Sequence, residues 1–529
     1  MKKIIVFCLA LLLAAAPALP SGAMASAPWE LDPEVEGRVT FFGFNGERIL
    51  YEDIGHAPFD ADHMFDSKLA ELVAVARLFN ARYPNVKINY YAITGEPNEG
   101  EISYQQEREN FRNEYGFYPD AWVVQDLTTD VKNGTAADLS RFAGEAMYDS
   151  FNKTLMDMAN YDGVQAGLPS YITPWVFPIN ISLAEKNNIE VPPVNWTFDE
   201  YVDFVSQADM TAFFGDIDAH SRMITAAAGT IARQFTLNGR IDFNTDEVKR
   251  MIDLLAKAAE YAVWSNYPGK VTDSIMNRYW WWDGMFFCKN ALLLDNWGSW
   301  LLSFFADPTS QYHMMADRWD VYPFPKANRG DDNNLLLVYD PIVIRNYAMD
   351  GADTALNDTR LAVTYAFISM FLADSEAIAA RAAAQYTDVN IDTGKTKLMT
   401  AVFDSLPVVS GAAFEAQMEI WYASPSHASM KDAAAMPGWH EVMRIYNAGE
   451  FACIDGRTSL IRYFENGENK SAFEEWDDLA NAIEGVAMID PGWADQIKSK
   501  LGEWTALTNE RLEKAELEMK DALARYYGR

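Results

Sequence analysis

The stretch DSKLAELVAVARLFNARYPNVKINYYA, residues 66–92, contains an amphipathic helix followed directly by a strand. One helix face collects apolar residues at the 3.6-residue spacing of an α-helix: Leu69, Leu72, Val73, Ala76 and Phe79. Asp66 or Ser67 can cap the helix at its start, and Pro84 ends it because proline lacks a backbone donor. The alternation from Val86 to Ala92 then predicts a strand.

Similar segments lie on both sides of this stretch. Arg38–Phe44 (RVTFFGF) is typical of a strand, Glu101–Tyr115 of a charged helix, and Asp120–Val124 (DAWVV) of a short buried strand. This alternation predicts a mostly parallel, right-handed α/β sheet. Ligands of such sheets bind beyond the carboxyl ends of the strands, which here carry Asn45 and Asp126.

The rest of the chain is richer in helix. Helical periodicity recurs in five segments: Asp199–Gln207, Asp246–Val263, Thr359–Ala373, Glu376–Gln385 and Trp493–Tyr527. The 529 residues suffice for three to four ordinary units or for two large lobes. We find no internal repeat and no low-complexity linker, and two lobes joined by several short crossings would leave no single linker to find.

The N-terminus has the layout of a secretory signal peptide. Lys2-Lys3 is a charged start, Ile4–Leu13 is an apolar run too short to span a bilayer, and Ala23-Met24-Ala25 fits a cleavage site. We expect residues 1–25 to be removed and the mature protein to be exported and soluble, in the periplasm or at the cell envelope. Cys8 lies inside the apolar run, so no cysteine stands where a lipid anchor would be attached.

Charge and cysteine content exclude some classes of protein. The formal charge of −33 argues against binding to nucleic acid or to an anionic membrane surface, both of which need clustered Lys and Arg. After processing, only Cys288 and Cys453 remain. They could pair in an oxidising compartment or remain two buried thiols, and neither belongs to a C-x-x-C pair typical of zinc sites.

The sequence contains no complete match to the catalytic and nucleotide-binding motifs considered below. His440-Glu441 begins an H-E-x-x-H zinc motif, but Arg444 occupies the position of the second histidine. Gly394-Lys395-Thr396 resembles the end of a phosphate loop, but Val389 stands where a glycine is required. The 76 acidic residues cannot by themselves identify a glycosidase pair. We therefore expect no enzyme, no cofactor and no metal.

Tryptophans gather in three places. They occur in Trp280-Trp281-Trp282, in Trp297-Gly298-Ser299-Trp300, and at Trp175 between prolines. Aromatic rings stack on the C–H faces of sugars, while nearby carboxylates and amides bind the hydroxyls. The pattern indicates a carbohydrate site, although any single tryptophan could equally belong to the core.

The order of several motifs resembles one family. The chain is similar to extracellular solute-binding proteins of family 1, the maltose-binding-protein-like receptors of ABC importers for oligosaccharides. The resemblance covers residues 36–415 and rests on these segments: Phe79, Tyr83, Pro84, Val86 and Lys87; Pro119-Asp120-Ala121-Trp122; Gly134 with Ala137-Asp138-Leu139; Asp162-Gly163 through Gly167-Leu168-Pro169; Asn180; Pro192-Pro193 with Trp196-Thr197-Phe198-Asp199-Glu200; Lys289-Asn290-Ala291 to Gly298-Ser299-Trp300; Arg318–Pro325; and Leu406-Pro407-Val408.

The resemblance implies a two-lobed, type II periplasmic-binding-protein-like α/β fold, with a ligand cleft between the lobes and a helix-rich C-terminal part. Residues 36–170 with 326–385 would form the first lobe, and 171–325 with 386–529 the second. The chain would cross between the lobes near Tyr171–Pro174 and Tyr322–Lys326.

The resemblance also implies a function without catalysis. The protein would be a monomeric receptor that closes on an oligosaccharide and then docks on the permease subunits of an ABC transporter. The implied ligand-binding residues are Asn45, Asp126, Trp175, Trp282, Trp297, Trp300, Tyr339 and Asp340. Two alternatives stay open: a secreted carbohydrate-active enzyme, and a receptor for a solute other than a sugar.

Overall fold

A computed structural model gives the arrangement of most of the chain. It describes residues 31–44, 48–59, 64, 67–93, 104–124, 127–207, 214–217, 224, 240–259, 262–264, 291–293, 297–298, 318–332, 334–351, 353–389, 395–401, 405–424, 427–452, 461–465, 468–477 and 492–529. The predicted signal peptide and both Cys288 and Cys453 lie outside these residues.

The predicted strand–helix–strand unit is confirmed. It consists of β1 (Gly37–Phe44), α2 (Ser67–Arg82) and β3 (Val86–Ile93). β1 and β3 are parallel and stay in register along their whole length. The apolar stripe of α2 is buried, with Leu69 and Phe79 at most 2% exposed, because this face packs on the sheet.

The next helix and strand along the chain add a further parallel strand to this sheet, as predicted. α3 (Tyr104–Tyr115) leads to β4 (Ala121–Val123), which pairs parallel with β1. An unpredicted short strand, β2 (Ile49–Tyr51), joins β3 in antiparallel orientation. The βαβαβ order thus places β3, β1 and β4 side by side and parallel, as expected for strands joined by helical crossovers.

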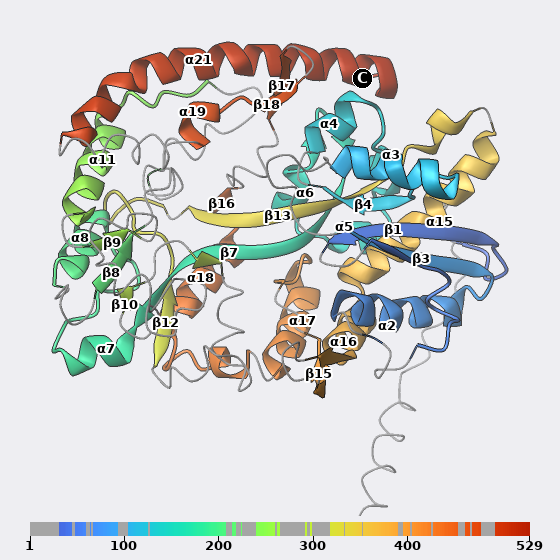
Figure 1. The fold of residues 1–529 in the computed structure, drawn as a ribbon, viewed down its shortest axis with the longest axis horizontal. Coiled ribbons are helices and arrows are strands. Elements are labelled where there is room, and N and C mark those ends of the chain that lie inside the picture. The colour runs from blue at the N-terminus through green and yellow to red at the C-terminus, as the bar shows by residue number, and fades with distance from the viewer. Residues whose placement is uncertain are drawn as a thin grey trace, which may run out of the picture.

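Two long antiparallel strands run through the middle of the molecule (Figure 1). β7 (Leu168–Asn180) and β13 (Leu335–Ile344) pair with each other, and β13 also pairs with β4. The strand order begins β2-β3-β1-β4-β13-β7, so β13, a strand from late in the chain, lies between the two early strands β4 and β7.

A second group of elements surrounds the far end of β7. Its strands are β8 (Phe214–Ile217), β9 (Ala262–Trp264), β10 (Ala291–Leu293), β11 (Trp297–Gly298) and β12 (Trp319–Tyr322). Its helices are α7 (Ile181–Lys186), α8 (Phe198–Val205) and α11 (Asp246–Ala259). α8 starts with a capping box, in which Thr197 and Glu200 each bond the other's backbone amide.

The buried apolar side chains form two clusters, called here the first core and the second core. The first core lies under β1, β3 and β4 and includes Phe41 and Trp122. The second core lies around α8 and α11 and includes Trp196 and Leu255. β7 belongs to both, because Ile172 packs in the first core and Phe177 in the second.

The C-terminal half is largely helical. α15 (Thr354–Ala373), α16 (Ser375–Ala382), α17 (Gly411–Ala423) and α18 (Pro437–Ala448) all contribute side chains to the first core. The helix predicted over Glu376–Gln385 is too long, since Gln385 opens the hairpin β14 (Gln385–Val389) and β15 (Thr396–Thr400). The boundaries of the two predicted lobes remain a prediction.

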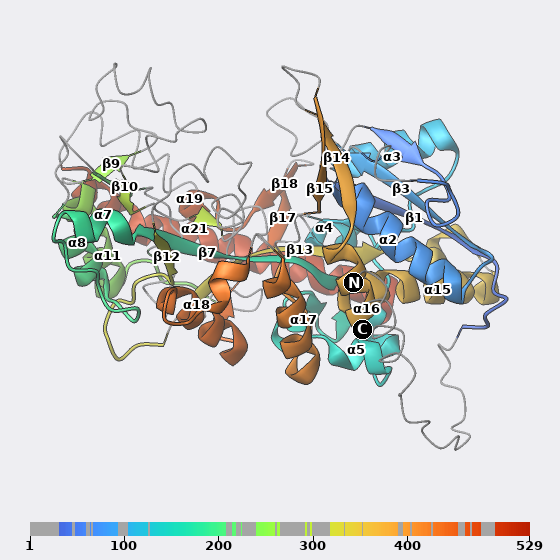
Figure 2. The same cartoon turned by 90° about the horizontal axis from the view of Figure 1, so that it is seen from below.

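One very long helix lies along an edge of the molecule. α21 (Trp493–Ala522) has 30 residues and continues into a turn of π-helix, Leu523–Tyr527. Figures 1 and 2 show it extending from the α11 end of the molecule to the end that holds α4 (Leu127–Lys132). It therefore spans both cores.

None of the helices among the described residues is, by itself, both long enough and apolar enough to cross a bilayer. α15 and α16 meet the length and composition test only together, and they are bent by 63° relative to each other.

Candidate functional site

The eight predicted ligand-binding residues are unevenly placed. Trp175 lies in β7, and both Tyr339 and Asp340 lie in β13. Trp297 lies in β11, where only its backbone is described. The remaining four lie outside the described residues: Asn45, Asp126, Trp282 and Trp300.

Strand pairing brings the described candidates onto neighbouring strands. β11 pairs with β7, so that Gly298 lies opposite Trp175. On the other side of β7, Asp340 of β13 lies opposite Tyr171. The sheet thus collects candidates that are more than 100 residues apart in the chain, close to where β7 passes from the first core to the second.

One face of the β7–β13 pair is partly exposed. Side chains alternate along a strand, and residues directly opposite in an antiparallel pair share a face. Tyr171, Trp175 and Asp340 therefore point to the same side, and all three are half-buried. This set of two rings and a carboxylate, with Val338, is called here the junction face. Tyr171 was predicted only as part of a crossing, not as a binding residue.

The opposite face of the same strands is core. Ile172, Leu337 and Tyr339 are fully buried there. The hydroxyl of Tyr339 donates to the carbonyl of Leu155 at 3.0 Å, so its polar end is already bonded inside the protein. Tyr339 and Asp340 are adjacent in sequence, but strand alternation places them on opposite faces.

The junction face spans both cores. At one end, the ammonium group of Lys68, on the first turn of α2, lies 5.8 Å from the centre of the Tyr171 ring. At the other end, Trp175 packs against the second core. Between them the hydroxyl of Thr173 is buried without a hydrogen-bond partner among the described residues.

An ionic cluster holds the helix that follows Asp126. The carboxylate of Asp130, on α4, accepts hydrogen bonds from Arg108 at 2.7 Å, from the indole of Trp122 at 2.9 Å and from Thr135 at 2.7 Å. Trp122 is 1% exposed, so it is a core residue and not a ligand contact. The start of α4 is thereby fixed next to the end of β4, where the sequence predicts a binding loop.

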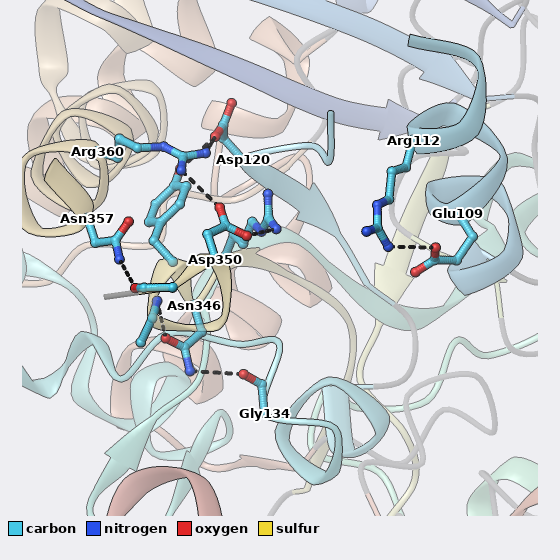
Figure 3. Close-up of polar contacts among 12 residues, drawn as sticks. Glu109, Arg112, Asp120, Gly134, Asn346, Asp350, Asn357 and Arg360 are labelled. Carbon is cyan, nitrogen blue, oxygen red and sulfur yellow. Dashed lines mark hydrogen bonds and ion pairs between the residues drawn. The ribbon is translucent and has the colours of Figure 1, made fainter. Parts of the chain in front are cut away.

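A second polar network fixes the other end of β4 (Figure 3). Asp120 is fully buried and accepts from the backbone amide of Thr40 and from the hydroxyl of Tyr347, each at 2.8 Å. Burial raises the pKa of Asp120, and these hydrogen bonds together with Arg360 oppose the shift. Arg360 also bonds Asp350 at 2.9 Å. These contacts join the start of β4 to β1 and to α15, at the end of the sheet opposite the predicted loops.

The interrupted zinc motif at His440 has ordinary polar partners. His440 contacts the carbonyl of Met430 at 3.1 Å, and the neighbouring Glu441 forms a two-pronged ion pair with Arg444. The residue that interrupts the zinc motif is therefore the salt-bridge partner of its glutamate. Within the described ranges, no three His, Cys, Asp or Glu side chains gather as a metal site.

No family model matches the chain, and no curated protein matches it either. Solved structures do match. The ABC substrate-binding protein Lmo0181 from Listeria monocytogenes, in complex with cycloalternan, aligns over 93% of this chain and 100% of its own, with a TM-score of 0.51 and 15% identity. The cyclic alpha-maltosyl-1,6-maltose binding protein from Arthrobacter globiformis aligns over 92% and 98%, with a TM-score of 0.50 and 14% identity.

A de novo designed cysteine esterase, ECH19, also matches, over 91% of this chain and 99% of its own, with a TM-score of 0.55 and 11% identity. At such identities the likeness establishes the fold and not the activity. The chain has the two-lobed α/β architecture of type II periplasmic-binding proteins, with a helix-rich C-terminal part, so the predicted fold class is confirmed.

Proposed function

We propose that this protein is the solute-binding receptor of an ABC importer. It captures an oligosaccharide between its two lobes and delivers it to permease subunits in the membrane. In this proposal the mature protein begins after Ala25, works as an exported monomer and catalyses no reaction. Two of the matched structures carry names of sugar-binding receptors, which supports this choice among the functions that the fold can host.

The junction face carries the proposal. It combines rings that suit the apolar face of a pyranose, Tyr171 and Trp175, with a carboxylate that suits its hydroxyls, Asp340. A solute lying on this face would touch residues supported by both cores. Such a ligand gains more contacts when the lobes approach each other, so it favours the closed state.

The remaining predicted contacts complete the proposed site. Asn45 and Asp126 follow the first-core strands β1 and β4, and Asp126 directly precedes the fixed helix α4. Trp282, Trp297 and Trp300 would add stacking surfaces from the second-core side. Tyr339 would act indirectly, by holding β13 in place through its bond to Leu155.

Calorimetric titration with a panel of sugars tests the proposal. Linear maltooligosaccharides, cycloalternan and unrelated β-linked oligosaccharides serve as probes, and chromatography of each mixture detects any product. We expect one class of sugar to bind and to be recovered intact. Trp175→Ala should then weaken binding at least about tenfold, or ~1.4 kcal/mol, because it removes a stacking surface.

Tyr339→Phe is the matched control. It alters an aromatic residue of the same sheet, but on the buried face, so the affinity should stay within about twofold while stability falls by about 1 kcal/mol. Equal affinity in wild type and Trp175→Ala would contradict the site. Release of product would favour the carbohydrate-active enzyme, and binding of a solute other than a sugar would favour the second alternative.

A further inference from the structure

The long helix α21 is anchored in the second core by its first two thirds. Ile497, Leu501 and Leu512 are fully buried there, together with Trp504. Polar contacts add to this anchor: the side chain of Asn509 bonds both the amide and the carbonyl of Ile241, each at 2.9 Å. This part of α21 therefore moves with the second core.

The end of α21 docks on the first core with far fewer apolar contacts. Met519 and Leu523 are buried in the first core, and Tyr527 packs against it. Tyr527 donates to the carbonyl of Ala136 at 2.8 Å, and the ring of Tyr526 lies over Gly134. A Cβ at Gly134 would lie 2.5 Å from that ring, and the φ of +70° also favours glycine.

A single lysine inserts between the two parts of the molecule. Lys132 ends α4, in the first-core half, and its side chain is 4% exposed. Its ammonium bonds the carboxylate of Glu518 on α21 at 2.6 Å and the carbonyl of Arg462. It also lies 5.2 Å from the centre of the Phe464 ring. The socket formed by Glu518, Arg462 and Phe464 is called here the lysine socket.

The lysine socket belongs to the second core. Arg462 and Phe464 lie in β17 (Arg462–Glu465), and Tyr463, between them on the same strand, is buried in the second core. The amide of Phe464 also donates to Glu518 at 3.0 Å, so β17 and α21 are joined by a contact that does not involve Lys132. The contact between Lys132 and the lysine socket thus joins the two halves at a second place. This place is separate from β7 and β13, the strands along which the chain crosses from one half to the other.

We propose that the end of α21 and the lysine socket form a detachable latch, which holds the two lobes in the orientation seen here. A helix of 30 residues is about 45 Å long and resists bending, so rotation of one lobe must break its weaker attachment. That attachment is the first-core end. Among the described residues it consists of the ion pairs Lys132–Glu518 and Arg529–Asp138, the hydrogen bond from Tyr527 to Ala136, and the side chains of Met519, Leu523, Tyr526 and Tyr527. The π-helical turn at Leu523–Tyr527 marks the same place. The latch does not depend on what solute the protein binds.

Förster transfer between dyes on the two lobes tests the latch without any ligand. The dyes are coupled to azide-bearing amino acids at exposed positions, Asn113 on α3 and Lys186 on α7. Lys132→Met removes the charge and keeps the length of the side chain, so the distribution of transfer efficiencies should broaden. Lys153→Met is the matched control, because Lys153 is 85% exposed and pairs only locally with Asp157.

Hydrogen exchange adds a readout that does not depend on the dyes. In Lys132→Met, amides of 518–527 should exchange about fivefold faster, whereas those of 497–512 stay protected. Should Lys132→Met fail to fold, Tyr527→Phe removes only the bond to Ala136 and should produce the same pattern to a smaller extent. Unchanged transfer and exchange in a folded variant would overturn the latch. Failure of sugar binding would overturn the proposed function and leave these measurements unaffected.

Discussion

A buried histidine makes stability depend on pH. The ring of His427 stacks on Trp421 at 3.6 Å, and its Nδ1 has no hydrogen-bond partner among the described residues. Burial holds the pKa of His427 at about 3, well below its ordinary value of 6.5. Between pH 6.5 and 3, His427 is therefore protonated in the unfolded chain but not in the folded chain. Folding stability is lost as the pH falls through this window.

We expect the free energy of unfolding to fall by at most about 1.4 kcal/mol per pH unit on account of His427. His427→Phe keeps the stacked ring but cannot bind a proton, so urea unfolding between pH 7 and 4 should show a shallower slope. The same substitution at His56, which lies at the surface beside Asp53, is made as the control variant. Parallel slopes in wild type and His427→Phe would refute the assignment.

For single residues, the sequence indicates which side chains have suitable chemistry for a site, but not which face of the sheet each side chain lies on. Trp175 and Asp340 are foreseeable as a ring and a carboxylate near a crossing, but Tyr171 becomes a candidate only through its pairing with Asp340. Tyr339 illustrates the converse, because the face on which it lies depends on strand register. Register is set by partners distant in the chain, and a single sequence does not reveal it.

The strand β12 and the start of the helix α18 lie unusually close to each other. Asp320 of β12 accepts hydrogen bonds from the backbone amides of Gly438 at 2.7 Å and Trp439 at 3.1 Å, and thereby binds the start of α18. A Cβ at Gly438 would lie 2.4 Å from the carbonyl oxygen of Val321. Only glycine lets the helix come this near to the strand.

Gly438→Ala should lower the free energy of unfolding by about 1–3 kcal/mol, because the added methyl group meets backbone that cannot move easily. Urea unfolding at neutral pH measures this loss. Gly330→Ala is the control, since a Cβ there meets no atom within 4 Å, and should change stability by less than about 0.5 kcal/mol. Equal stability of the two variants would contradict the close packing of α18 on β12.

The sequence predicts well the elements that have strong local signals. It does not predict every helix, and it does not reveal which strands pair. α2 and β3 follow from periodicity and from Pro84, whose effects act within a few residues. α17 and α18 were missed, and the start of α15 was placed five residues late. The two-lobed architecture came from the order of family-like motifs, because no local pattern shows that β13 lies between β4 and β7.

The whole molecule should change shape when it binds its ligand. A solute that touches both lobes is bound more tightly by the closed state, so it shifts the population towards a compact form. Small-angle scattering with the tightest sugar of the panel should show a smaller radius of gyration than without it. Ligand at a hundredfold excess over Kd should also stabilise the fold by about 2.7 kcal/mol, seen as a higher Tm.

A sugar-free sample and a sugar that does not bind are the controls for this experiment. A rigid groove would bind sugar and raise the Tm, but it would leave the scattering curve unchanged. That result would exclude closure as the signal read by a permease, while leaving the junction face as a binding site.

The position of β13 also sets the order in which the protein can fold during synthesis. Val123 of β4 and Ile172 of β7 leave the ribosome early, but their common neighbour, β13, ends only at Ile344. Until then the nascent chain has two strand edges without the strand that joins them, so the central sheet stays incomplete. For the export proposed above, such a late strand would leave the central sheet unformed until most of the chain has been made.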